Sequence, residues 1–324
     1  MRALPPIDPD IHKARTLPGW FYGHPEWHER VLESVFLPSW QLLPTRVQAP
    51  ECGVVPFEVL GRPLILSSEN RCFSNVCTHR GAVIAETACT TLRCPYHGRR
   101  FGLDGRMQGA PGFEDVRDQD HLPELALRRF GPLTFASPEG DSPCPADTLA
   151  LPETAWEDGP QQQFDIDCSW ALYVENYLEG LHIPFVHPGL NAALSWGRYR
   201  NHIGGLSTLQ EGVDEHGAVI ARYWWLWPNT MVNLYPWGLS LNQVQPLGPD
   251  RCRVHYFTLV SDPGHLHQGA GADVGAVELE DQRIVSSVQR GVRSPLYTRG
   301  RFSPSHEAGV HRFQCLLREA LRVP

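Results

Sequence analysis

Two short loops that each pair one cysteine with one histidine constrain this chain more than any other feature. They read Cys77-x-His79 and Cys94-x-x-His97, and 14 residues lie between His79 and Cys94. Thiolates and imidazoles are soft or borderline ligands, which together select iron–sulfur clusters, zinc or copper. Four such ligands in so short a stretch predict a metal centre, and the surrounding chain must hold the two loops together.

The arrangement of the ligands distinguishes between two kinds of centre. A structural zinc site uses the same ligand types, but it usually pairs cysteine with cysteine and histidine with histidine. Here each loop mixes the two types, which suits a [2Fe–2S] cluster with two cysteines on one iron and two histidines on the other, the Rieske arrangement. We therefore expect Cys77, His79, Cys94 and His97 to bind such a cluster, with a zinc site as the alternative.

The residues around these ligands resemble a known family. Residues 77–81 read Cys-Thr-His-Arg-Gly and residues 94–98 read Cys-Pro-Tyr-His-Gly, which resembles the cluster motif of Rieske oxygenases. Respiratory Rieske proteins carry a disulfide cysteine at the positions of Ala82 and Tyr96. Because this chain has no cysteine at either position, the resemblance is to the low-potential, ferredoxin-like branch.

The overall composition is that of an ordinary globular chain of about two domains. Of its 324 residues, 42% are hydrophobic and 20% are charged, and no apolar run is long enough to cross a membrane. The first residues lack the apolar core of a signal peptide, so we expect a cytoplasmic protein. The net charge of −8 argues against nucleic acid and anionic membranes as partners. The cysteines outside the two loops are expected to be free thiols.

Prolines, glycines and apolar periodicity divide the chain into four parts. We expect an N-terminal arm and helix over residues 1–38, a small antiparallel β domain with the cluster over 39–137, a proline-rich linker over 138–162 and a second domain over 163–324. The first domain should hold strands at 41–47, 54–60, 63–67, 71–76 and 129–136. The second should hold strands at 205–211, 219–227, 230–235, 239–245 and 252–261, and helices at 170–181, at 274–290 and from 304 onward. A long antiparallel sheet flanked by helices is an α+β architecture.

A second set of candidate metal ligands begins at His182 and His187. In a continuous helix these two residues would be about 140° apart and could not share one ion. Pro184 lies between them and should bend the chain, so that His187 turns back towards His182. Two imidazoles and one carboxylate are the ligands of non-haem iron(II) oxygenases. The alternative is a pair of loop histidines with ordinary hydrogen bonds.

The carboxylate is expected to come from the helix at 274–290, which offers Glu278, Glu280 and Asp281. Four apolar residues define its predicted buried stripe: Val277, Ile284, Val285 and Val288. Asp281 falls inside that stripe, whereas the two glutamates fall on its flanks. A buried carboxylate is costly unless it is paired or binds metal, so Asp281 is the predicted ligand. The alternative is an Asp281 that is satisfied by Arg283 or by a backbone amide.

The family resemblance now extends over most of the chain. Rieske oxygenase α subunits carry Asp/Glu-x-x-His-x₄-His and a late Asp ligand, and this chain has Glu179, His182, His187 and Asp281 in that order. The resemblance implies a helix-grip (START-like) second domain with mononuclear Fe(II), and a homotrimer in which Glu179 bridges a cluster histidine and an iron histidine across a subunit boundary. The alternative interpretation of Glu179 is a solvated residue on the surface of a helix, without a bridging role.

The same resemblance implies a terminal oxygenase that uses O₂ to hydroxylate or oxidatively demethylate a small organic substrate, either a quaternary or methylated amine or an aromatic. Electrons would come from NAD(P)H only indirectly, through a separate flavin or iron–sulfur reductase with or without a ferredoxin. Residues 227–249 resemble the choline monooxygenase branch. An electron carrier with a ligand-binding second domain is the alternative function, and a zinc-dependent hydrolase is the third.

Two further sequence features need an interpretation. Six aromatic residues crowd one stretch of the expected sheet: Tyr223, Trp224, Trp225, Trp227, Tyr235 and Trp237. Because alternate residues of a strand face opposite ways, half of them could line a cavity and attract a quaternary ammonium, while core packing is the other role. Glycines at 269–275 resemble a dinucleotide loop, but no βαβ unit surrounds them, so we expect neither NAD nor flavin to bind there.

Overall fold

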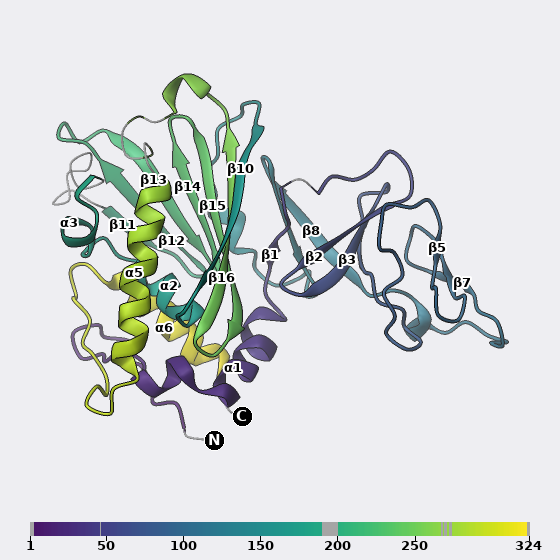
Figure 1. Cartoon of the computed structure of the whole chain (residues 1–324), viewed down its shortest axis with the longest axis horizontal. Helices are drawn as coiled ribbons and strands as arrows, with labels where there is room; N and C mark the ends of the chain where they lie inside the picture. Colours follow the sequence, from purple (N-terminus) through teal and green to yellow (C-terminus); the bar gives the residue numbers. More distant parts are fainter. Residues whose placement is uncertain are drawn as a thin grey trace. The chain divides into compact units, whose positions relative to one another are not determined.

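The structure is a computed structural model that describes residues 3–45, 47–189, 200–266, 268, 271 and 274–322. The chain divides into two compact units: residues 38–143 form one, and residues up to Leu37 together with those from Cys144 onward form the other. The elements of both units are labelled in Figure 1. Among the described helices, none is both long enough and apolar enough to cross a membrane.

The unit at 38–143 is built from short antiparallel strands. Its larger sheet has the described strand order β1-β9-β8-β4-β3-β2, and β5, β6 and β7 form a smaller one. A two-residue turn at Leu60 and Gly61 joins β2 to β3, and both residues have positive φ, as the tightest hairpin turns require. The bounds are β1 Gln41–Leu42, β2 Val54–Val59, β3 Arg62–Ser67, β4 Cys72–Ser74, β5 Leu92–Arg93, β6 Arg100–Phe101, β7 Met107–Gly109, β8 Glu124–Phe130 and β9 Leu133–Ser137.

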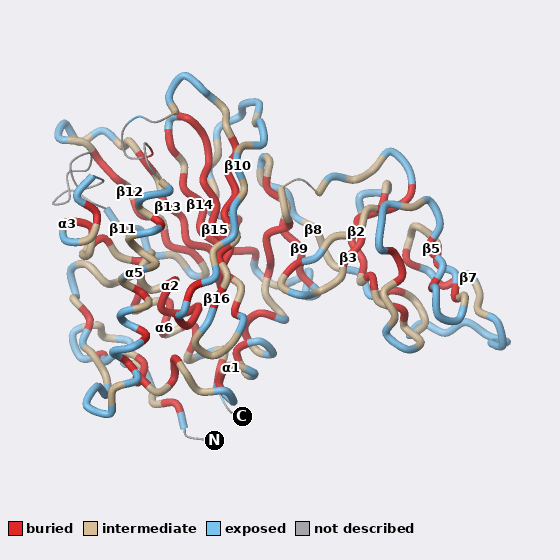
Figure 2. Tube along the Cα trace, in the orientation of Figure 1, coloured by how far each residue is buried: buried red, intermediate tan, exposed pale blue. Residues whose placement is uncertain are grey.

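The other unit is organised around one long antiparallel sheet. In the part of the chain that the structure describes, the strand order is β10-β16-β15-β14-β13-β12-β11. These strands span Glu157–Ile166 (β10), Arg200–Ile203 (β11), Ser207–Val213 (β12), Val219–Leu226 (β13), Thr230–Tyr235 (β14), Gly238–Gly248 (β15) and Arg251–Val260 (β16). The red tube segments in Figure 2 show that the middle strands are the buried part of this sheet.

Helices of the same unit pack on this sheet and on one another. Their bounds are α1 Pro25–Val31, α2 Trp170–Tyr177, α3 Ile183–Val186, α5 Val274–Val292 and α6 Ala308–Ala320. The long helix α5 runs along the sheet with α2 beside it (Figure 1). Mostly antiparallel sheets with few helices confirm the predicted α+β fold.

The N-terminal arm belongs to the unit with the long sheet. The Leu17 amide donates to Gln314 Oε1 at 2.6 Å, and Gln289 Nε2 donates to the Tyr22 carbonyl at 3.2 Å. Tyr22 Oη also donates to the partly buried Glu175 at 2.9 Å. Buried polar groups of the arm, α2, α5 and α6 therefore satisfy one another in one network.

Several element boundaries differ from the sequence-based expectation. Strand β10 begins at Glu157, within the stretch that was expected to be a linker, because it is an edge strand whose first residues are exposed and therefore polar. Strand β11 was not expected at all, and it is also a polar edge strand. Strand β1 has only two residues, and α2 ends at Tyr177 instead of continuing to 181.

Candidate functional site

The two predicted cluster loops adopt matching backbone conformations. In the first, the Cys77 amide donates to the Ala82 carbonyl and the Gly81 amide donates to the Cys77 carbonyl. In the second, the Cys94 amide donates to the Arg99 carbonyl and the Gly98 amide donates to the Cys94 carbonyl. Both glycines have φ near +70°, a conformation that other residues adopt at a cost. The glycine after each Cys–His pair is therefore a requirement of the turn.

Buried polar side chains tie the two loops to each other. Arg99 is 3% exposed, and its Nη1 donates to Thr78 Oγ1 and to Asp120 Oδ1, each at 3.0 Å. Thr78 Oγ1 donates in turn to the Asp120 carbonyl at 2.8 Å. The Arg99 guanidinium also lies 4.5 Å from the centre of the Phe113 ring, which adds a cation–π attraction. One arginine thus links the second loop to the first.

The four predicted cluster residues meet at the ends of these loops. Cys77 and Cys94 are buried, and the rings of His79 and His97 lie 4.7 Å apart. His79 Nδ1 is buried without a hydrogen-bond partner, and such a group is costly unless something binds it. Two thiols on the buried side and two imidazoles on the outer side fit a [2Fe–2S] cluster with cysteines on one iron and histidines on the other.

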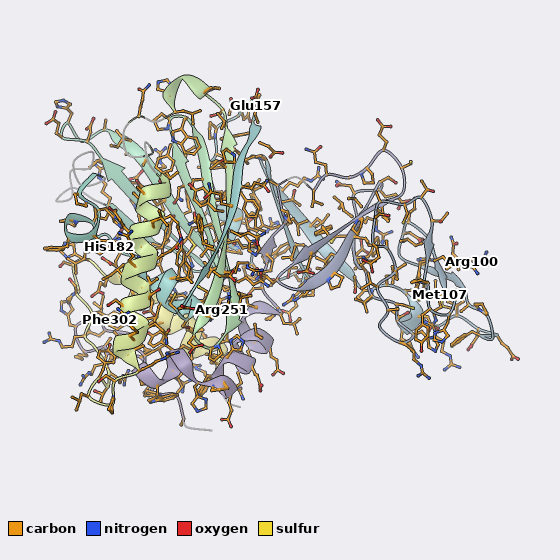
Figure 3. All side chains as sticks on the ribbon, viewed as in Figure 1. Arg100, Met107, Glu157, His182, Arg251 and Phe302 are labelled. Atoms are coloured by element: carbon orange, nitrogen blue, oxygen red, sulfur yellow. The ribbon has the colours of Figure 1, made fainter. Side chains whose placement is uncertain are left out.

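The second predicted set also converges. One ligand atom from each of His182, His187 and Asp281 lies within 4.8 Å of the other two. Asp281 Oδ1 is 3.0 Å from His187 Nε2 and 3.7 Å from His182 Nε2. His182, labelled in Figure 3, precedes the one-turn helix α3, and His187 follows it. Two imidazole nitrogens and one carboxylate in this geometry fit a non-haem iron site.

Pro184 plays a different part from the expected one. It was predicted to bend the chain between the two histidines, but it lies in the first turn of α3, where a proline needs no amide hydrogen bond. The histidines meet because His187 leaves helical geometry, with φ −119° and ψ 75°. Their rings are consequently 5.1 Å apart.

Both histidines are oriented by further carboxylates. His182 Nδ1 donates to Glu179 Oε1 at 2.6 Å, and the other oxygen of Glu179 accepts from the amides of Leu181 and His182. His187 Nδ1 donates to Glu280 Oε2 at 2.7 Å. These bonds leave each Nε2 facing Asp281, which is the usual arrangement around metal-binding histidines. Burial alone would lower the pKa of His187, but Asp281 and Glu280 outweigh it and raise that pKa.

Helix α5 presents a polar buried face, and the predicted apolar stripe is wrong in part. Val288 is exposed, whereas Glu278 and Gln289 are buried. Asp281 is 18% exposed and also accepts from Asn176 Nδ2 at 2.6 Å. The reason is that this face of α5 meets a cavity and buried hydrogen-bond partners, so its inner residues are polar. Sequence reasoning therefore placed Glu278 on the flank of the helix and missed its position on the buried face.

The cavity lies between α5, α2 and the long sheet, beside the histidines. Its volume is about 100 Å³, and His182, His187 and Asp281 are part of its wall. Five tyrosines also line it: Tyr173, Tyr177, Tyr223, Tyr235 and Tyr256. Among the described lining residues there is no lysine and no arginine. The arrangement offers a small aromatic pocket next to a metal site.

The crowded aromatic residues divide between the two roles that were considered. Tyr223 and Tyr235 line the cavity, with ring centres 5.9 Å apart. Trp225 and Trp227 instead pack against Phe313 of α6. Most of the glycine-rich stretch at 269–275 lies outside the described residues. Gly271 is described, and a side chain there would collide with Tyr235 and Trp237.

Comparison with known families assigns both units. Residues 39–122 match the Rieske [2Fe-2S] domain, and residues 199–322 match the catalytic domain of the ring hydroxylating alpha subunit. The first match contains all four predicted cluster residues, and the second contains Asp281.

Curated relatives cover nearly the whole chain. Choline monooxygenase from Beta vulgaris is 28% identical over 98% of this chain and 80% of its own length. The carnitine monooxygenase oxygenase subunit of Escherichia coli (strain K12) is 28% identical over 96% of this chain and 95% of its own.

Solved structures show the same fold. The quaternary ammonium Rieske monooxygenase CntA in complex with L-carnitine matches with a TM-score of 0.76 and 23% identity, over 97% of each chain. Naphthalene 1,2-dioxygenase from Rhodococcus sp. matches with a TM-score of 0.72 and 18% identity, over 94% of this chain and 93% of its own.

Proposed function

The chain belongs to the Rieske non-haem iron oxygenases, and we propose that it oxidises a small quaternary or methylated amine as the terminal oxygenase of a multicomponent system. Cys77, His79, Cys94 and His97 would hold the cluster. His182, His187 and Asp281 would hold the mononuclear iron. When bound, the cluster carries electrons and the iron activates O₂.

The reaction balances as a monooxygenation. One oxygen atom enters a C–H bond of the substrate, the other leaves as water, and two electrons and two protons are consumed. We expect a separate reductase to supply the electrons, as the family resemblance implies. The protein's part is to hold the metals, to orient the substrate and to limit access of water.

The proposed substrate class is inferred from the tyrosine-lined cavity beside the three predicted iron ligands. Tyrosine rings attract ammonium groups through cation–π interactions, and the described lining residues include no lysine and no arginine. The cavity of about 100 Å³ is smaller than the roughly 150 Å³ apolar cavity that binds benzene in an engineered protein. A compact amine therefore fits better than a polycyclic aromatic.

Electron transfer between subunits is the second part of the proposal. The Glu179–His182 contact gives the iron site a carboxylate that could also accept from a cluster histidine of a neighbouring subunit. The fold of CntA, for which inter-subunit electron transfer is described, supports this role with a TM-score of 0.76 over 99% of the chain. We therefore expect a homotrimer in which each Glu179 couples two subunits.

A single-turnover experiment tests the substrate class without the unidentified reductase. The protein is reduced with dithionite, freed of excess reductant and mixed with O₂ and either choline, L-carnitine or indole. We expect oxidised product from an amine, measured by mass spectrometry, and none from His182→Ala. Product from indole alone would overturn the amine assignment. Product formation by His182→Ala would contradict the assigned iron site.

A further inference from the structure

The cavity contains one carboxylate that the metal sites do not use. Glu278 is 4% exposed and lies on α5, one turn before Asp281. It accepts hydrogen bonds from Tyr173 Oη at 2.6 Å, Asn242 Nδ2 at 3.2 Å and Gln282 Nε2 at 3.2 Å. All three donors are neutral, and no described cationic side chain contacts Glu278. A buried carboxylate without a cationic partner is costly.

The protonation behaviour of Glu278 agrees with that geometry. Burial, together with the charge of Asp281, raises the pKa of Glu278 to about 7, although its three donors partly oppose the shift. The negative charge of this group is thus poorly compensated inside the protein. A cation in the cavity would compensate it.

Two amide oxygens on the same cavity wall have no partner. Asn242 Oδ1 and Gln210 Oε1 are buried acceptors without a hydrogen bond, and both residues line the cavity. Their orientation is fixed, because Asn242 Nδ2 also donates to Tyr173 Oη at 2.8 Å and Gln210 Nε2 donates to the Tyr177 carbonyl at 2.7 Å. A buried acceptor without a donor costs stability, so these oxygens favour a ligand that brings an O–H or N–H group.

From these contacts we propose that Glu278 and Asn242 form a subsite that selects a compact ammonium alcohol and rejects a carboxylated betaine. The ammonium group lies beside Glu278 and the tyrosine rings, and the hydroxyl group donates to Asn242 Oδ1, which belongs to a residue in contact with Glu278. A substrate carboxylate placed there would meet Glu278 and would find no lysine and no arginine among the described lining residues. This inference rests on the proposed amine oxidation and specifies its substrate.

The same geometry predicts which carbon is presented to the iron site. Residues three apart on a helix have Cβ atoms about 5–6 Å from each other, and Glu278 and Asp281 have this spacing. An ammonium group beside Glu278 therefore brings carbons one or two bonds from the nitrogen towards His182, His187 and Asp281. A longer chain between the nitrogen and the oxidised carbon would not fit between the two carboxylates.

Ligand binding to the iron-loaded, oxidised protein tests the subsite independently of turnover. Isothermal titration calorimetry would compare four probes: choline, its neutral isostere with a tert-butyl group, tetramethylammonium and L-carnitine. We expect choline to bind at least about tenfold more tightly than each of the others, because it alone has both the cation and the hydroxyl without a carboxylate. Equal affinity for choline and its neutral isostere, or tighter binding of L-carnitine, would overturn the proposal.

Substitution of Glu278 assigns the effect to this residue. We expect Glu278→Gln to lose about 10- to 100-fold in choline affinity, the typical effect of a hydrogen-bonded charge, and Glu278→Asp to keep the preference for choline over its isostere. The exposed Glu319→Gln is the matched control and should bind as the parent does. Unchanged choline binding by Glu278→Gln would overturn the assignment. If that variant does not fold, the probe comparison on the parent protein decides the question.

The outcomes also separate this inference from the proposed function. If L-carnitine is the amine that binds and turns over, the protein is an amine oxygenase and the ammonium-alcohol subsite is wrong. If no amine binds and indole is oxidised, the proposed function itself is wrong.

Discussion

The two predicted metal sites of this chain are built in opposite ways. All four cluster residues come from two loops between Cys77 and His97, and each loop closes on itself through backbone hydrogen bonds. The iron site joins His182 and His187 to Asp281, which is 94 positions from His187 in the chain. A local motif can thus be recognised in the sequence by its spacing, whereas the second site depends on how α5 packs beside α3.

The histidines of the two predicted sites also differ in their exposure to solvent. His97 is exposed and His79 is half-buried, while the two cysteines behind them are buried. His187 is 1% exposed, and its ring is held between Asp281 and Glu280. The histidine side of the predicted cluster site is therefore accessible to other molecules, whereas the predicted iron site is enclosed.

Removal of one ligand from each site should have the largest effect. Cys94→Ser should lose the [2Fe–2S] cluster and its visible spectrum while iron remains at the other site, and Asp281→Ala should do the reverse. Both should lose turnover. Iron and acid-labile sulfide per chain, measured together with the visible spectrum, check this. Loss of both metals from either variant would show that the two sites are not independent.

Glu179→Gln should slow electron transfer without removing a metal. The amide keeps a hydrogen-bonding group near His182 but cannot act as a carboxylate bridge, so we expect cluster reoxidation to slow by roughly 100-fold, at the upper end of effects for residues that support metal ligands. Stopped-flow spectroscopy of the pre-reduced variant with substrate and O₂ measures the rate. Reoxidation at the parental rate would exclude the bridge.

Glu280→Ala should have a smaller effect, because Glu280 orients His187 and does not bind the metal in this geometry. We expect iron affinity to fall by about 10- to 100-fold while the cluster spectrum is unchanged. Iron retention during dialysis against a graded series of chelator concentrations measures this, with Asp281→Ala as the reference for complete loss. Complete iron loss in Glu280→Ala together with retention in Asp281→Ala would reverse the ligand assignment.

A partly buried carboxyl outside both predicted sites, that of Glu175, should affect only stability. Burial raises the pKa of Glu175 from 4.5 to about 8. Between these pH values the folded state binds a proton that the unfolded state has lost, so the free energy of unfolding should fall as pH rises through this window. We expect Glu175→Gln to remove roughly 3–5 kcal/mol of that decrease. Urea unfolding at several pH values, with Glu319→Gln as control, measures it. An unchanged pH dependence would contradict this assignment.

The sequence was sufficient for the features that depend on local chemistry. The mixed Cys–His spacing predicts the four cluster residues, which the structure brings together. The strands in the middle of the long sheet were predicted from their long, nearly continuous runs of buried residues. Asp281 was selected by helix phase, and the structure brings it together with both histidines. Family models confirm the two domain types.

Other features could not be predicted because they depend on tertiary packing. The apolar stripe of α5 was partly wrong, since the helix packs against a polar cavity and its buried face carries Glu278 and Gln289. Only one sequence feature indicated the role of Glu278, which was its position one helical turn before the predicted ligand Asp281. The edge strand β10 was hidden for a similar reason, because its exposed residues lack apolar alternation.

Complementation between two inactive variants tests most directly whether the cluster of one subunit passes electrons to the iron site of a neighbouring subunit. Cys94→Ser has iron but no cluster, and Asp281→Ala has the cluster but no iron. Mixed assemblies purified through a different affinity tag on each variant contain both. In a cyclic trimer of two kinds of subunit, one junction in three pairs a working cluster with a working iron site, so we predict about one third of parental turnover. Turnover no higher than that of the separate variants would contradict electron transfer between subunits.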